Sequence, residues 1–366
     1  MQVCSDTDTG AHVNRQRALW ASTSTSTRGG VASFVRTMQA TPLWELWNIR
    51  HVSTHRNGSV VTRIGVFVTG LGSFVTALVF DRPDVVHLHT SVAGSFIRKA
   101  ILTWICRIFR VPVVMHVHGS DFHLFYGRSP RPLKAIIRAT LTSADVVVAL
   151  GDRWVERLGR IAPQAKVVSV PNAVRPCRPV RQPSGGEPVH VLFLGCVGDR
   201  KGTFTLLEAW AKMIGDGKGR ARLTIAGDGE VQRARERVEE LSVGSTVTVL
   251  GWLAPDRVPE LLASAQVLAL PSRNEGQPMA ILEAMAHGVC VVASAVGGIP
   301  ELIDHRCGLL VPVDDVEALA QALRHVVYDD DARTRLGSQA LQRIRSEFDV
   351  DVVWRRFDAL YREVLR

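Results

Sequence analysis

The stretch Pro271 to Ala286, PSRNEGQPMAILEAMA, links a short apolar segment, Gln266 to Leu270, to a helical pattern. The apolar segment predicts a buried strand, and Pro278 is placed to begin the helix. In an open α/β sheet, ligands bind where such strands end, and the free amides of the following helix favour an anion such as phosphate. The stretch therefore predicts an α/β fold with an anion site, next to which lie Glu275 and Glu283.

Two carboxylates beside a diphosphate would repel it unless each meets hydroxyl groups, which a sugar nucleotide offers on both sides of its phosphates. The E-x7-E pattern of Glu275 and Glu283, followed by VVASAVGGIPELI at 291–303, resembles the donor-site signature of the retaining glycosyltransferases of family 4. The resemblance implies that Glu275 lies by the transferred sugar and that Glu283 holds the ribose. Further donor contacts are then expected from Gly276, Gln277, Pro278 and Met279. Complementation of the helix dipole would explain Glu283 alone equally well, but not the whole string.

The same resemblance implies the GT-B fold, in which two Rossmann-like, doubly wound parallel-sheet domains face a central cleft. We predict an N-terminal acceptor-binding domain at 1–180, with a polar lead at 1–16, and a C-terminal nucleotide-sugar-binding domain at 181–345. The proline-rich and glycine-rich segment 171–188 is typical of a connection between domains. In the family, the last helix, here at 346–366, crosses back to the N-terminal domain.

Alternating strand and helix patterns support a parallel sheet in each half. Strands are predicted at 18–23, 47–53, 84–89, 111–118, 145–150 and 166–170, with helices at 31–40, 64–80, 92–109, 131–142 and 152–160. The second half has strands at 190–195, 222–227, 247–253 and 266–270, with helices at 203–214, 230–241 and 255–264. The helix at 64–80 is uncharged, but it is short for a bilayer span and is interrupted by glycines, so we expect it to be buried.

The overall composition restricts the class of protein. A chain of 366 residues, 46% hydrophobic and 22% charged, is long enough for two globular domains. Its net charge of +9 indicates an acidic partner, such as a phosphorylated substrate or an anionic membrane, and no recognition motif points to nucleic acid. The six cysteines form no CxxC pair, and the first 17 residues lack the apolar stretch of a signal peptide, so a cytoplasmic protein is expected.

A second anion site is predicted in the loop Gly195 to Gly202, GCVGDRKG, which also joins a strand to a helix. There Arg200 and Lys201 could stabilise the charge that develops on a departing nucleotide diphosphate. Family members have an Arg directly after the first glycine and a Lys before a later one. This chain has Cys196 at the first place and Lys201 at the second, so Arg200 replaces the missing contact only in part. A solvated loop is the simpler interpretation, and the position in the sheet argues against it.

Weaker motifs lie in the first half. A Gly-Gly pair ending at Gly30 follows the first strand and gives a turn where the backbone can approach a phosphate or sugar; its match to the family places Gly30 on the donor side. His118 ends the strand at 111–118 and matches the family's active-site His, which contacts the donor sugar. Asp121 and His89 are candidates for the acceptor side, although His89 is also explained as a polar residue that finishes a buried strand.

No pattern predicts a metal site. His116 and His118 share one face of their strand, yet no third and fourth zinc ligand follows at a suitable spacing. The Asp-x-Asp pairs at 6–8 and 349–351 are typical of a tail and a helix cap. We therefore expect metal-free catalysis by Glu275, His118 and Lys201, with no cofactor and a nucleotide-diphosphate sugar as co-substrate.

Basic and large apolar residues are mixed in the predicted helix at 92–109 and again at 128–138. Such a mixture suits the headgroup level of an anionic membrane, and a core helix with a solvated face explains it equally well. A peripheral position on the inner face of the plasma membrane is therefore one expectation.

These patterns together predict a retaining glycosyltransferase of cell-envelope polysaccharide biosynthesis. It would move a hexose from a nucleotide-diphosphate sugar to a hydroxyl of a lipid-linked or polysaccharide-precursor glycan. Two alternatives stay open. A glycoside hydrolase also uses a pair of carboxylates, and a sugar-nucleotide-binding protein that has lost turnover would account for Cys196.

Overall fold

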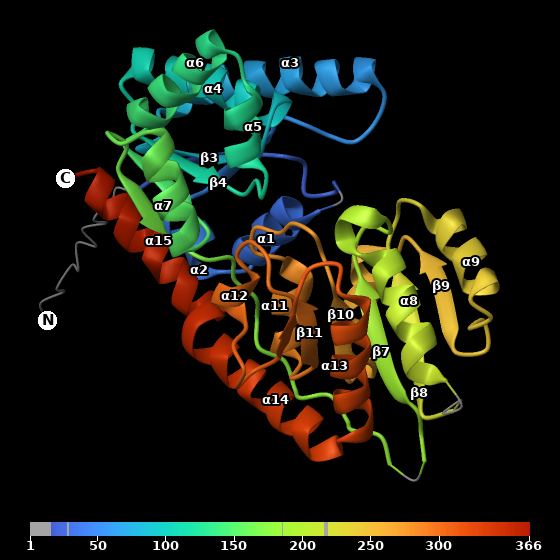
Figure 1. Ribbon diagram of the computed structural model, residues 1–366. Coiled ribbons are helices and arrows are strands. Elements are labelled where there is room, and N and C mark those ends of the chain that lie inside the picture. The colour runs from blue at the N-terminus through green and yellow to red at the C-terminus, as the bar shows by residue number, and fades with distance from the viewer. Residues whose placement is uncertain (1–15, 28, 185, 216–218) are drawn as a thin grey trace, which may run out of the picture.

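The computed structural model describes residues 16–27, 29–184, 186–215 and 219–366, and these residues form two six-stranded sheets. The polar lead predicted at 1–16 lies outside the described residues except for residue 16, and the Asp-x-Asp pair at 6–8 lies outside them entirely. Every strand pair in both sheets is parallel. Figure 1 shows the N-terminal sheet and its helices above the C-terminal sheet. The architecture is the two-domain α/β fold that the sequence predicts.

The N-terminal sheet has the strand order β2-β1-β3-β4-β5-β6. Its strands are β1 (Ala18–Ser22), β2 (Arg50–Ser53), β3 (Val85–Thr90), β4 (Val113–Val117), β5 (Val146–Ala149) and β6 (Val167–Ser169). Successive side chains point to opposite faces, so each strand contributes to two apolar layers. One layer lies under α3 (Val60–Thr76), α4 (Gly94–Phe109), α5 (Phe122–Arg128), α6 (Arg131–Ser143) and α7 (Asp152–Ile161). The other lies under α1 (Gly30–Gln39), α2 (Pro42–Leu46) and α15 (Val350–Val364).

The C-terminal sheet has the order β12-β11-β10-β7-β8-β9. Its strands are β7 (Val189–Leu194), β8 (Ala221–Ala226), β9 (Val247–Gly251), β10 (Val267–Leu270), β11 (Cys290–Ser294) and β12 (Leu309–Val311). Its helices are α8 (Thr203–Ile214), α9 (Val231–Glu240), α10 (Val258–Ser264), α11 (Met279–Ala286), α12 (Ile299–Leu302), α13 (Val316–Tyr328) and α14 (Asp330–Arg343), with short 3-10 turns η2 (Asp199–Lys201) and η3 (Pro255–Arg257). The strand order reverses between β7 and β10, and such a switch point is where doubly wound sheets bind ligands.

The chain returns to the N-terminal domain at its end. After α14, a π-helical turn, η4 (Ile344–Phe348), leads to Asp349, whose carboxylate caps α15 by accepting a hydrogen bond from the amide of Asp351 at 2.9 Å. Helix α15 then buries Phe357 and Tyr361 against the N-terminal sheet, in the apolar layer that contains Trp20. Figure 1 shows α15 running along the N-terminal domain. The last helix therefore ties the two domains together.

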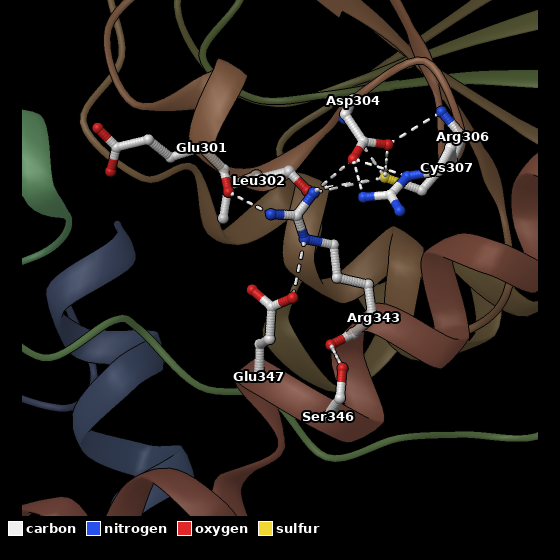
Figure 2. Close-up of polar contacts among 8 residues, drawn as sticks. All are labelled: Glu301, Leu302, Asp304, Arg306, Cys307, Arg343, Ser346 and Glu347. Carbon is white, nitrogen blue, oxygen red and sulfur yellow. Dashed lines mark hydrogen bonds and ion pairs between the residues drawn. The ribbon is translucent and has the colours of Figure 1, made fainter.

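Arg343 at the end of α14 fastens the segment that follows α12 (Figure 2). Its guanidinium donates a hydrogen bond to the carbonyl oxygen of Glu301 at 3.0 Å and lies 3.6 Å from a carboxylate oxygen of Asp304. Hydrogen bonds from Arg306 hold the pKa of the Asp304 carboxyl well below its usual range, so this anchor stays ionised. Because α12 begins directly after Gly297 and Gly298, the anchor fixes the position of that glycine pair.

The helix predicted at 64–80 differs from the expectation. It begins at Val60, runs as α3 to Thr76 and continues as a π-helical turn, η1 (Ala77–Asp81). The prediction that it is buried was wrong, because only 22% of its apolar stretch is buried and Val61 is 80% exposed. A helix with apolar residues on every side is expected to be buried on every side. The sheet, however, covers only one side of α3. The short helices α2 and α5 were not predicted.

Candidate active site

The loops after β7 and β10 meet because these two strands are neighbours in the sheet, with Val191 paired to Val267. The β7 loop carries Lys201 in η2, and the β10 loop carries Glu275. Gly202 allows their close approach: its φ is +71°, and a Cβ atom there would lie 1.9 Å from the carbonyl oxygen of Pro271. A side chain at this position would therefore push the two loops apart.

Glu275 is almost completely buried, with 5% of its surface exposed. Its carboxylate forms an ion pair with the ammonium of Lys201 and accepts a hydrogen bond from the Ser272 hydroxyl at 2.7 Å. The side chain of Lys201 is also largely buried. A buried carboxylate needs such a partner, because an unpaired charge removed from water is strongly destabilising. The structure thus brings the two predicted residues into direct contact.

The glycine pair of the downstream motif packs against the glutamate loop. Gly297 has φ +57°, and a Cβ atom there would lie 1.8 Å from the carbonyl oxygen of Glu275. A Cβ atom on Gly298 would lie 2.1 Å from the carbonyl oxygen of Gly276. The backbone of Glu275 and Gly276 is therefore held by a neighbouring backbone that has no side chains in the way, which explains why the two parts of the sequence signature occur together.

The N-terminal domain reaches this loop through the segment between β4 and α5. The carbonyl oxygen of His118 lies 3.5 Å from the position of a Cβ atom on Gly276. The Asn274 side chain donates a hydrogen bond to the carboxylate of Asp121. His118 is fixed in turn by its own amide, which donates to the carbonyl oxygen of Thr90 at 2.8 Å. His118 and Asp121 of one domain therefore lie beside Glu275 of the other.

His118 is joined to His89 by a hydrogen bond of 3.0 Å between Nε2 and Nδ1. Burial lowers the pKa of His118 to about 3 and that of His89 well below its usual value, so both rings are neutral at neutral pH. Two neutral imidazoles joined in this way share one proton, and the ring that donates fixes the tautomer of the other. The other ring nitrogen of His118 can therefore donate or accept a hydrogen bond with a ligand, according to the tautomer, and the ring carries no charge.

Three buried histidines, His87, His89 and His116, place one ring nitrogen each within 4.8 Å of one another. Sequence reasoning did not expect His87 and His89 to join His116. The His87 ring, however, is stacked on both others: its plane is inclined by 18° to that of His89 and by 23° to that of His116. A bound ion lies near the plane of each imidazole that ligates it, and stacked planes share no such point. Trp20 packs on His89 at a tilt, and Phe34 meets His116 edge to face, so the cluster is an aromatic layer of the core.

Glu283 lies on α11 and faces the N-terminal domain. The hydroxyl of Ser33, on α1, donates a hydrogen bond of 2.9 Å to its carboxylate. Burial raises the pKa of Glu283, and the hydrogen bond from Ser33 and the charge of Arg36 oppose the shift. Gly30, at the start of α1, lies beside the first residue of α11, since a Cβ atom on it would be 3.5 Å from Cγ of Met279. The glycine turn and the start of α11 are therefore neighbours.

The other residues that were predicted to bind the donor lie in different parts of the two loops and of α11. The side-chain oxygen of Gln277 accepts a hydrogen bond from the amide of Asn172 in the connection between domains, so its donor role stays a prediction. Pro278 is the N-cap of α11. Arg200 is exposed, and its carbonyl oxygen accepts from the amide of Arg273 at 2.9 Å. Cys196 is exposed in the same loop. Neighbouring groups still shield its thiol in part from water, which raises the pKa of the thiol.

Sequence reasoning missed three residues that hold the site together. Ser272 and Asn274 flank Glu275 in the quoted stretch, and their polar side chains could have been noticed there. Ser33 follows the glycine pair by three residues, which places it on the first turn of α1. Ser33 and Glu283 are 250 positions apart in the sequence, and no local sequence pattern can predict a contact over such a separation.

Two family models match the chain. The model described as "Glycosyl transferase 4-like domain" matches residues 17–173, and the model described as "Glycosyl transferases group 1" matches residues 188–329. The chain is 28% identical to 2-deoxystreptamine N-acetyl-D-glucosaminyltransferase of Streptomyces fradiae, over 76% of this chain and 70% of that protein. It is 24% identical to the putative teichuronic acid biosynthesis glycosyltransferase TuaC of Bacillus subtilis, over 73% of this chain and 67% of that protein.

Solved structures share the fold. Sucrose-phosphate synthase from Thermosynechococcus elongatus superimposes with a TM-score of 0.81 at 20% identity, covering 96% of this chain and 99% of that one. Anabaena HepE in complex with UDP superimposes with a TM-score of 0.75 at 18% identity, covering 95% of this chain and 100% of that one. With one family model on each domain and GT-B structures as neighbours, the chain belongs to the group 1 glycosyltransferases of GT-B fold, which use nucleotide sugars.

Proposed function

We propose that this glycosyltransferase transfers a hexose from a nucleotide-diphosphate sugar to a hydroxyl of a lipid-linked or polysaccharide-precursor glycan, with retention of the anomeric configuration. The observation that carries the proposal is the buried Lys201–Glu275 pair at the switch point of the C-terminal sheet, with His118 of the other domain beside it. The pair joins a cation for phosphate to a carboxylate for sugar hydroxyls in one place. The name of the relative TuaC supports an envelope glycan as acceptor.

When the donor binds, the ammonium of Lys201 moves away from Glu275 and forms an ion pair with a phosphate oxygen instead. The amides at the start of α11 have no partners within their helix and point their positive dipole end at the same diphosphate. Arg200, which is exposed in the β7 loop, adds a second cation. These groups stabilise the negative charge that develops on the departing nucleotide diphosphate, so the charge of a metal ion is not needed for that step.

The carboxylate of Glu275, released from Lys201, accepts hydrogen bonds from hydroxyls of the transferred sugar. His118 holds the same sugar from the N-terminal side through a neutral ring nitrogen. The acceptor hydroxyl approaches the front face of the sugar past Asp121, while the buried His89 acts only by holding His118, and the departing phosphate oxygen takes the proton of that hydroxyl. Glu283 exchanges the hydroxyl of Ser33 for a ribose hydroxyl. We propose a cytoplasmic enzyme that contacts an anionic membrane peripherally, where lipid-linked acceptors lie.

A panel of nucleotide sugars that differ in base and hexose tests the proposal, with binding and slow donor hydrolysis as readouts. One of them should bind and be hydrolysed without an acceptor, and NMR of the transferred product should show the anomer of the donor. Glu275→Gln and Lys201→Met should each lower the rate of transfer by about 10²-fold or more. A product with the inverted anomer would contradict the retaining mechanism.

The chain contains a matched control for these variants. Lys212 and Glu317 form an ion pair of 2.9 Å in the same domain, with more than half of each side chain exposed. Lys212→Met and Glu317→Gln make the same chemical changes away from the junction and should leave the rate of transfer unchanged. Wild-type transfer by Glu275→Gln or Lys201→Met would remove that residue from the mechanism. Binding without hydrolysis of any donor would favour a protein that has lost turnover.

A further inference from the structure

Helix α3 presents a stripe of apolar side chains to solvent. Val61, Ile64 and Val68 are exposed at a spacing that places them along one side of the helix. Val60, next to this stripe, and Val79 and Phe80 in η1 are exposed as well. The segment from Val60 to Asp81 is long and apolar enough to cross a membrane by length and composition. Soluble proteins rarely expose an apolar surface of this kind, so we expect another molecule to cover the exposed side of α3.

Helix α3 cannot cross a bilayer, because its second half belongs to the core of the N-terminal domain. Gly70 packs so closely on β2 that a Cβ atom there would lie 2.3 Å from the carbonyl oxygen of Ser53. Phe74 and Leu78 are buried in the layer between the helices and the sheet. A helix fixed in this way can only lie along a surface, with the exposed stripe turned outward.

Helices α4 and α6 continue the exposed surface. Ile97, Ile101, Trp104 and Ile108 form a second stripe along α4, and Ile108 is 79% exposed. The indole of Trp104 donates a hydrogen bond of 3.2 Å to the Thr140 hydroxyl on α6, a helix on which Ile136 is also exposed. Figure 1 shows α3, α4 and α6 on the same side of the N-terminal domain, across the sheet from α15. We call the exposed side of these three helices the outer face.

The outer face carries positive charge only. Helices α3, α4 and α6 contain no Asp or Glu. The cations on them that reach solvent are Arg63, Arg98, Arg107, Arg131, Lys134 and Arg138. Within the residues that the structure describes, none of these six forms an ion pair, whereas Arg233 and Arg237 of the C-terminal domain are each paired with two carboxylates. The cations of the outer face therefore remain available for an anionic partner.

We propose that the outer face docks on an anionic lipid bilayer, with α3 lying in the headgroup plane. Apolar stripes flanked by unpaired cations combine the two attractions that hold a peripheral helix at such a surface. A second copy of the chain suits the face poorly: a two-fold interface would oppose each patch to itself and bring cations against cations. The docking rests on this face alone. If the proposed function also holds, it places the enzyme where a lipid-linked acceptor is found.

Vesicle flotation with the full chain tests the docking. The wild type should bind vesicles of phosphatidylcholine and phosphatidylglycerol, and bind vesicles of phosphatidylcholine alone much more weakly. The triple variant Val61→Ser, Ile64→Ser, Val68→Ser should lower the partition coefficient about ten-fold or more. The triple variant Arg131→Gln, Lys134→Gln, Arg138→Gln should lower it about five-fold for each charge removed, and only on the anionic vesicles. The latter loss should fade at high salt.

Matched controls lie on the C-terminal half. Leu250→Ser with Val313→Ser removes exposed apolar side chains there, and Arg335→Gln, Arg345→Gln, Arg366→Gln removes three exposed cations. Both controls should bind vesicles as the wild type does, and all variants should keep the wild-type unfolding midpoint. The proposal is overturned if the wild type does not bind, if the outer-face variants bind unchanged, or if the wild type is a dimer that the apolar variant turns into a monomer.

Nucleotide-sugar hydrolysis measured without vesicles separates this inference from the proposed function. None of the substituted residues lies at the junction of the two domains, so each variant should hydrolyse the donor at the wild-type rate. Absence of hydrolysis in the wild type would count against the proposed function and leave the vesicle result standing. Normal hydrolysis together with no vesicle binding would overturn the docking, and with it the peripheral membrane contact, and would leave the proposed sugar transfer standing.

Discussion

The two domains meet at one junction, but they bring different chemistry to it. The C-terminal domain contributes charge: Lys201 and Glu275 form a buried ion pair, and Arg200 lies in the same loop. The N-terminal sheet ends in His89 and His118, whose pKa values are lowered by burial, so that the rings carry no charge at neutral pH. In the proposed function, the charged side takes the diphosphate and the uncharged side takes the sugar.

The two sides are also held in place differently. Backbone contacts that only glycine permits fix the charged side, since Gly202 lies against Pro271 and Gly297 lies against Glu275. Ring packing fixes the imidazole side, where the His87 ring is stacked on both His89 and His116 and the rings of His116 and His118 lie 3.9 Å apart at a tilt of 31°. Backbone packing therefore holds the two charged loops together, whereas contacts between side chains hold the rings. This contrast leads to four tests.

The largest expected effect is on the buried ion pair. Glu275→Gln or Lys201→Met leaves one buried charge without a partner and should lower the free energy of unfolding by about 3–5 kcal/mol. The double variant removes both charges, so it should be more stable than either single variant while staying inactive. Urea unfolding measures the free energies, and the exposed pair Lys212–Glu317 serves as control. Additive losses in the double variant would contradict a coupled pair.

Gly297→Ala tests the backbone packing of the charged side. The left-handed φ of +57° and the overlap with the carbonyl oxygen of Glu275 should together cost about 2–4 kcal/mol of stability. Gly186 is the matched control, because its φ is +87° and no atom lies within 4 Å of an added Cβ. Gly186→Ala should show the cost of the backbone angle alone. Equal losses in the two variants, measured by urea unfolding, would show that the contact with Glu275 is not tight.

His116→Phe tests the imidazole side through its pH dependence. Burial, together with the neighbouring His118 and His87, lowers the pKa of His116 well below 6.5. Below pH 6.5 the unfolded chain therefore binds a proton that the folded ring excludes, and stability falls as pH falls. From pH 6.5 to pH 5, the variant should lose about 2 kcal/mol less than the wild type. Phe34→Leu, which alters the same aromatic layer without removing a titratable group, should keep the wild-type pH dependence. A loss in His116→Phe that equals or exceeds the loss in the wild type would contradict the prediction.

Glu283→Gln should change the free energy of unfolding least among the four tests. Burial raises the pKa of this carboxyl above 4.5, so the folded state favours the protonated form. Above pH 4.5 the unfolded chain ionises first, and the wild type loses stability as pH rises toward the folded value. The glutamine keeps an oxygen that accepts from Ser33, so the variant should be slightly more stable than the wild type at pH 7 and equal to it below pH 4. Unfolding curves at the two pH values measure the difference, and a variant less stable at pH 7 would contradict it.

Much of the fold could be predicted from the sequence, because strands and helices leave local patterns. The β10–α11 junction followed from QVLAL and Pro278, and β7 with its basic loop followed from HVLFLG and Lys201. The exposure of α3 could not be predicted, because hydropathy reports how apolar a helix is and not how much of it the neighbouring sheet can cover. The stacking of His87 on His116 could not be predicted either, because these residues meet only when β3 and β4 pair.

The sequence by itself determined the two parallel sheets, the family, and the presence of Glu275, Lys201 and His118 near strand ends, because period and motif are local properties of a chain. Only the tertiary structure decided which of these groups touch. The pairing of Lys201 with Glu275, the bonds of Ser33 to Glu283 and of Asn274 to Asp121, and the open side of α3 all depend on the order of strands and the docking of domains. Those contacts join residues far apart in sequence, whose meeting is set by packing free energy rather than by local propensity.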